Sequence, residues 1–88
     1  MGKVSVTVRV LPENVEEDME KIAGAIKQKI PENIKFRGYQ IMDIAFGLKA
    51  VLFNVLADDE KGGIEQLNQE IEQMNNVGSV EVVDLTLV

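Results

Sequence analysis

Hydrophobic residues along this chain switch between the spacing of strands and the spacing of helices, and the order of these switches limits the available folds. Residues 4–10 alternate, with valine at every second position and Ser5, Thr7 and Arg9 between the valines. A period of two is typical of a strand with one buried face. The first element is therefore predicted to be a strand that ends at Pro12.

A helix is predicted to follow this strand and to stop before Pro31. Asn14, with Glu17 three residues later, resembles a capping box at its start. Acidic residues precede basic ones along the segment, which is the charge order that the helix dipole favours. The hydrophobic residues that recur at helical spacing are Val15, Met19, Ile22, Ala23, Ile26 and Ile30.

Two strands are predicted next, over residues 34–42 and 48–56. In the first, simple alternation places Ile34 and Phe36 on one face and Tyr39 on the other. In the second, both alternating sets are largely apolar, as expected of a strand that is covered on both faces. The second of these strands is therefore expected in the middle of a sheet.

A second helix and a fourth strand complete the pattern. An acidic, glycine-containing turn over residues 58–63 leads into hydrophobic residues at helical spacing, which are Ile64, Leu67, Ile71 and Met74. Asn75, Asn76 and Gly78 are predicted to end this helix. Residues 80–88 are then predicted to form the last strand.

The predicted order is β-α-β-β-α-β, and it uses almost the whole chain as one domain, residues 1–88. With right-handed crossovers, this order produces a four-stranded antiparallel sheet with both helices on one face. No linker, repeat or low-complexity segment interrupts it. We therefore predict an α+β fold, the ferredoxin-like βαββαβ sandwich.

Two segments do not fit a sheet whose open face meets only water. The turn between the second and third predicted strands contains Ile44 and Phe46, where Asn, Asp or Gly is usual. In the last strand the apolar residues are even-numbered up to residue 82 and odd-numbered from residue 83 to residue 87. Either a β-bulge at residues 82–83 reverses the faces, or the open face is itself apolar.

Composition excludes several classes of function. The chain has no Cys, His or Trp, and its formal charge is -6. A thiol nucleophile, an imidazole base, a Cys or His zinc site and a disulfide are all ruled out. The negative charge argues against binding nucleic acid directly, and no apolar run approaches the ~20 residues of a membrane helix. We therefore expect a cytoplasmic protein with no catalytic residues, no cofactor and no membrane contact.

The acidic run Asp58-Asp59-Glu60 is the main candidate for a metal site, because neighbouring carboxylates bind Mg²⁺ or Ca²⁺. Consecutive side chains of a turn diverge, however, and no further ligands follow at the spacing of a calcium loop. The favoured interpretation is a solvated acidic turn without a metal.

Phe46 has two interpretations. It either folds back over the edge of the sheet as part of the core, or stands at an apolar hairpin tip beside Lys49 and docks into a pocket on another protein. The sequence pattern leaves both open.

Three segments together resemble the translation elongation factor 1-beta family, most closely its short archaeal form. They are residues 43–50 (DIAFGLKA), 55–63 (VLADDEKGG) and 77–82 (VGSVEV). The resemblance covers essentially the full chain and corresponds to the C-terminal exchange domain of the longer eukaryotic proteins.

This resemblance implies a guanine nucleotide exchange factor that binds the GTPase carrying aminoacyl-tRNA and speeds the release of its GDP. In the family, the hairpin aromatic inserts into the GTPase, and the C-terminal strand end reaches toward the magnesium and phosphate site. The residues assigned to partner binding are then Phe46, Gly47, Leu48, Lys49, Leu87 and Val88. Such a factor needs no acid, base or metal, because only a higher affinity for the nucleotide-free GTPase shifts the equilibrium.

One residue departs from the family pattern. Eukaryotic members carry a Lys just before the last residue, whereas an ungapped alignment of the chain ends places Leu87 there. Exchange by this chain therefore does not depend on that ammonium group. Steric displacement of a switch segment or of the phosphate loop is the alternative mechanism.

Two other classes of function share these features. A small-ligand regulatory domain of the ACT type has the same βαββαβ order, but is usually fused to an enzyme and pairs into a dimer around its ligand. A structural adaptor would bind the GTPase without accelerating GDP release. For an exchange factor we expect a free chain that is monomeric.

Overall fold

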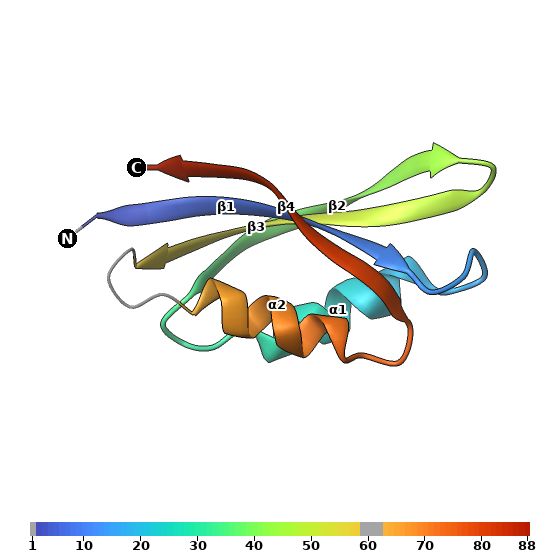
Figure 1. The fold of residues 1–88 in the computed structure, drawn as a ribbon, viewed down its shortest axis with the longest axis horizontal. Coiled ribbons are helices and arrows are strands. Elements are labelled where there is room, and N and C mark those ends of the chain that lie inside the picture. Colours follow the sequence, from blue (N-terminus) through green and yellow to red (C-terminus); the bar gives the residue numbers. More distant parts are fainter. Residues whose placement is uncertain (1, 59–62) are drawn as a thin grey trace.

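The computed structural model describes residues 2–58 and 63–88, and its six elements follow the predicted order (Figure 1). Its sheet has the strand order β2-β3-β1-β4, and all neighbouring strands are antiparallel. The α+β ferredoxin-like fold is therefore confirmed. Its elements are β1 (Lys3–Pro12), α1 (Met19–Lys29), β2 (Lys35–Ala45), β3 (Leu48–Asp58), α2 (Ile64–Glu72) and β4 (Val77–Leu87).

Both helices lie on one side of the sheet, and this side contains the hydrophobic core (Figure 1). The even-numbered valines of β1 are buried there against the odd-numbered residues of β3, with Phe53 at the centre. From the helices, Ile22 and Ile26 of α1 and Leu67 and Ile71 of α2 are fully buried against them. Neither α1 nor α2 covers the opposite face of the sheet (Figure 1). Across residues 2–58 and 63–88, no helix is long and apolar enough to cross a membrane.

The first helix begins later than predicted. Asp18 is its N-cap, and its carboxylate accepts a hydrogen bond from the backbone N–H of Glu20 at 3.0 Å. The capping box predicted at Asn14 is wrong, since the Asn14 side chain accepts a backbone N–H two residues later within a turn. Val15 is 58% exposed, whereas Met19 is buried. The helix therefore starts with the first residue that packs on the sheet.

The second helix ends at Glu72, before the asparagines that were predicted to end it. Gly78 belongs to β4, so its predicted role in ending the helix is also wrong. A Cβ at this position would lie 2.7 Å from the carbonyl oxygen of Pro12. Gly78 is therefore needed where β4 passes close to the end of β1.

A β-bulge in β2 corrects the predicted placement of Tyr39. The pairing with β3 shifts between Phe36 and Gly38, which leaves Arg37 as an extra residue. Phe36 and Tyr39 consequently share the helix-covered face, with ring centroids 6.4 Å apart. The prediction of opposite faces is wrong because alternation does not count an inserted residue.

A second bulge confirms the first of the two alternatives for β4. Thr7 pairs with Asp84 and Val8 pairs with Val82, so Val83 is the extra residue. The apolar residues before and after the bulge therefore all face the helices. Val83 itself lies on the open face, beside Arg9.

The single tyrosine of the chain offers a test of how β2 packs on α1. The Tyr39 hydroxyl donates a hydrogen bond to Oε2 of Glu20 at 2.7 Å, and this bond, with the carboxylate charge, raises the pKa of Tyr39 above 10.0. We expect the ultraviolet titration of the phenol to show a midpoint above this value, and Glu20→Ala to return it toward 10.0. Because folding favours the neutral phenol, the contribution to stability is full below the unfolded pKa and is lost as pH rises through the raised pKa. Equal midpoints in the two proteins would show that the contact does not form.

Candidate functional site

The hairpin between β2 and β3 closes with a two-residue turn, Phe46 and Gly47. The φ angles are 51° at Phe46 and 82° at Gly47, so both residues have the left-handed backbone that tight hairpin turns require. Glycine adopts this conformation without a steric penalty, but a bulky residue does not. An aromatic residue therefore occupies a position where folding favours Asn or Gly, which points to a function for its side chain.

The Phe46 side chain is fully exposed, with a relative exposure of 103%. The alternative in which it folds back as core is wrong, because no side chain of residues 2–58 and 63–88 covers it. Ile44 and Met42, at 44% and 40% exposed, extend the apolar surface along β2. Lys49 is exposed beside the turn. The hairpin therefore presents an apolar tip with a cation next to it.

The conformation of Phe46 predicts a stability effect. We expect Phe46→Asn to raise the free energy of unfolding by about 0.5 to 1 kcal/mol, because Asn tolerates the left-handed region better and the exposed ring has no core contacts to lose. Urea denaturation of the two proteins measures the difference. A variant less stable than the native chain would indicate that the ring supports the fold.

Leu87 and Val88 lie at the opposite end of the molecule from the hairpin tip (Figure 1). Their relative exposures are 69% and 73%, and the backbone N–H of Val88 donates to the carbonyl oxygen of Lys3 at 2.9 Å. The longest dimension of the molecule is 42 Å. The structure thus brings residues 46–49 together at one end and keeps residues 87–88 at the other.

The acidic turn is only partly described. Asp58 is the last residue of β3 and pairs with Lys3 of β1, whereas Asp59 and Glu60 lie outside the described residues. In the part of the chain that the structure describes, no three carboxylates gather as the ligands of a metal ion would.

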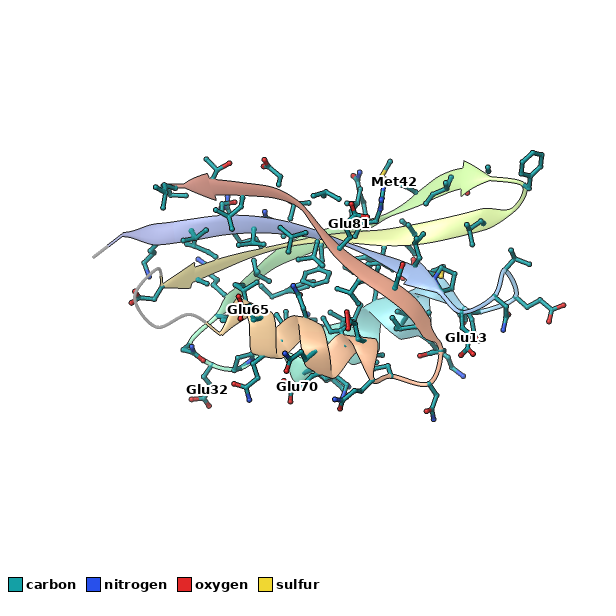
Figure 2. The ribbon with its side chains drawn as sticks, viewed as in Figure 1. Glu13, Glu32, Met42, Glu65, Glu70 and Glu81 are labelled. Carbon is teal, nitrogen blue, oxygen red and sulfur yellow. The ribbon has the colours of Figure 1, made fainter. Side chains whose placement is uncertain are left out.

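The open face of the sheet contains residues that the sequence pattern did not group together. Nη2 of Arg9 on β1 lies 2.6 Å from a carboxylate oxygen of Glu81 on β4. Glu81 and Met42 both point away from the helices (Figure 2). The change of parity in β4 was the available signal, but it left open whether Val83 lay on this face.

One family model matches almost the whole chain. Residues 5–88 match the EF-1 guanine nucleotide exchange domain. The chain is 39% identical over 83 residues to elongation factor 1-beta of Staphylothermus marinus, covering 93% of this chain and 92% of that protein. It is 37% identical over 87 residues to elongation factor 1-beta of Thermofilum pendens, covering 98% and 96%.

Solved structures resemble the chain in fold. The solution structure of the ACT domain from GTP pyrophosphokinase of Chlorobium tepidum has a TM-score of 0.69 at 13% identity, covering 93% of this chain and 88% of that one. The C-terminal domain of MgtC from Mycobacterium tuberculosis has a TM-score of 0.61 at 17% identity, covering 100% and 88%. At these identities the likeness concerns the fold alone.

Proposed function

Since this chain belongs to the family of EF-1 guanine nucleotide exchange domains, we propose that it contacts its GTPase at two places, the hairpin tip around Phe46 and the strand end at Leu87 and Val88. The chain is a guanine nucleotide exchange factor of translation elongation, and its partner is an elongation factor GTPase. The finer proposal is that the partner is the GTPase that delivers aminoacyl-tRNA, and that binding speeds the release of its GDP.

The proposed mechanism is one of differential affinity. A factor that binds the GDP form and the nucleotide-free form equally well shifts nothing, however tightly it binds. The groups that act must therefore make contacts that the GDP form does not allow. Side chains that are rigid, apolar and exposed on the free factor suit this role. Their apolar surface is buried only when the partner rearranges to cover them.

The proposal for the first contact rests on the exposure of Phe46. Aromatic residues in desolvated pockets account for much of the energy of protein interfaces, and Phe46 is fully exposed on a short turn. Gly47 permits the turn, and half-buried Leu48 fixes the first residue of β3 to the sheet. The exposed ammonium of Lys49 suits an acidic group at the rim of the pocket.

The strand end supports the second contact. Leu87 and Val88 are exposed, yet backbone pairing with β1 holds them in an extended conformation. An ordered apolar strand end fits the displacement of a switch segment or phosphate loop. The Leu87 side chain has no ammonium group with which to compete with magnesium.

The proposed setting follows from the same function. Translation elongation takes place in the cytoplasm, and we place the protein there. We propose that residues 1–88 act as one exchange domain, that the free chain is monomeric, and that it works without a cofactor, direct contact with nucleic acid or membrane attachment.

The ACT-like regulatory domain remains the second candidate on fold alone. Mass measurement with and without amino acids separates the two functions, because ligand-induced dimerisation favours the regulatory domain. A complex with the elongation GTPase favours the exchange factor.

The test of the proposal is the release of fluorescent GDP from the cognate elongation GTPase. We expect catalytic amounts of the native chain to accelerate release in the presence of excess unlabelled nucleotide. Binding to the GTPase without acceleration would indicate an adaptor instead.

A further inference from the structure

The open face of the sheet contains a groove of about 330 Å³, which we call the open-face groove. It lies between the proposed contact at the hairpin and the centre of the sheet. Its lining is mostly apolar, and the residues that matter are Arg9, Met42, Ile44, Ala50, Leu52 and Val83.

Three features of the strands form this groove. Ala50 is its small floor residue and is fully buried, and Met42 pairs with it from β2. Leu52 pairs with Arg9 across β1 and β3. The bulge in β4 adds Val83, which is 42% exposed. Val83 thus adds an apolar side chain to a face on which β4 otherwise presents polar residues, such as Glu81 and Asp84.

Arg9 gives the groove an unused hydrogen-bond donor. One end of its guanidinium is taken by Glu81, at 2.6 Å. Its Nε is buried and has no acceptor within residues 2–58 and 63–88. A buried N–H without an acceptor is unfavourable, and this one lies beside an apolar surface that is open to a partner.

The position of the groove links the two proposed contacts. The hairpin tip and the C-terminus lie at opposite ends of the sheet (Figure 1), along a molecule 42 Å long. Met42 and Glu81 project from the side away from the helices, in the region between these ends (Figure 2). A partner that covers the open face between the hairpin tip and the end of β4 therefore passes over the open-face groove, while the Leu87 side chain itself lies on the helix-facing side.

We propose that the open-face groove is the central part of the surface that binds the elongation GTPase. The groove receives an apolar side chain of the GTPase, and an oxygen acceptor beside that side chain binds the guanidinium of Arg9, whose side chain is 37% exposed. This inference rests on the proposed function and extends it from the two ends to the open face of the sheet. It also gives the bulge at Val83 a role in recognition.

The test uses matched lysine substitutions on β4. Val83→Lys places an ammonium group at the groove, whereas Ser79→Lys makes the same charge change on an exposed position of the same strand and face, outside the groove. We expect Val83→Lys to lower kcat/KM for GDP release at least tenfold and Ser79→Lys to stay within twofold of the native chain. Met42→Lys is a second groove variant, on another strand, and should behave like Val83→Lys.

Arg9→Met separates recognition from stability. It removes the donor that lacks an acceptor while keeping an apolar chain of similar length. We expect its Tm to stay near that of the native chain while its kcat/KM falls severalfold. A fall in Tm that parallels the loss of exchange would mean that Arg9 acts through the fold, and would overturn its assigned role.

The outcomes distinguish this inference from the function on which it rests. If the native chain accelerates GDP release and both groove variants match it at native Tm, the groove inference is wrong and the exchange function stands. If the native chain itself fails to accelerate release, the proposed function has failed. A native dimer in sedimentation that Val83→Lys dissociates would assign the groove to a second copy of this chain, and would also overturn the inference.

Discussion

Phe46→Ala should lower kcat/KM for GDP release from the elongation GTPase by about 30-fold or more, while the fold remains intact. Burying a Phe side chain contributes about 2 to 3 kcal/mol, and each 1.4 kcal/mol corresponds to about a factor of ten. The fully exposed ring makes no contribution of this size to folding, so the loss appears in the complex alone. Stopped-flow release of fluorescent GDP over a range of factor concentrations measures it.

A matched control for this variant is Val82→Ala. Val82 is another exposed apolar residue, at 39%, but it lies on the helix-facing side of β4 and away from the hairpin. We expect this variant to exchange GDP at nearly the native rate. If Phe46→Ala also exchanges at the native rate, the hairpin tip is not the contact, and the proposed function would need another surface.

The long regular elements were predictable because burial on one face imposes a period on the sequence. The alternating valines of β1 and the apolar residues of α2 each have a single physical explanation, and the structure agrees with both. The order of six such elements then leaves few topologies. The ferredoxin-like fold follows from these patterns because short connections and right-handed crossovers exclude most of the others.

The errors occur where a single residue changes the register. The bulge at Arg37 moved Tyr39 to the helix-covered face, and the signal that alternation overlooked is Gly38, a glycine within the strand whose φ is 132°. The start of α1 moved from Asn14 to Asp18 because both residues are good caps, and packing of Met19 on the sheet decides between them. Local sequence cannot weigh such alternatives, because the deciding contacts come from distant strands.

The candidate site was predictable only in part. An aromatic residue at a turn position suited to Asn is visible in the sequence, and Phe46 was identified from it. Its exposure required the structure, since the same pattern fits a residue folded over the sheet. The open-face groove was not identified, because it combines residues from all four strands and depends on which way the bulge turns Val83.

Removing Leu87 and Val88 should reduce the maximal rate of GDP release about tenfold, with a smaller effect on binding of the nucleotide-free GTPase. If the strand end displaces a segment of the nucleotide site, its loss removes contacts that form only as GDP leaves, and such contacts govern the rate more than the affinity. Burial of one Leu side chain is sufficient for an effect of this size. The measurements are the plateau of the release rate at saturating factor and the affinity for nucleotide-free GTPase.

The truncated chain is expected to stay folded, because both residues are mostly exposed and the hydrogen bond from Val88 to Lys3 lies at the end of the sheet. Leu85→Ala is the matched control, since it removes an exposed apolar side chain from the same face of β4 but leaves the strand end in place. If Leu85→Ala slows release as much as the truncation, the effect comes from the exposed apolar surface at this end of the molecule and not from the strand end in particular. If the truncated chain reaches the native plateau, the strand end takes no part in exchange, and release depends on contacts made by the hairpin and the open face.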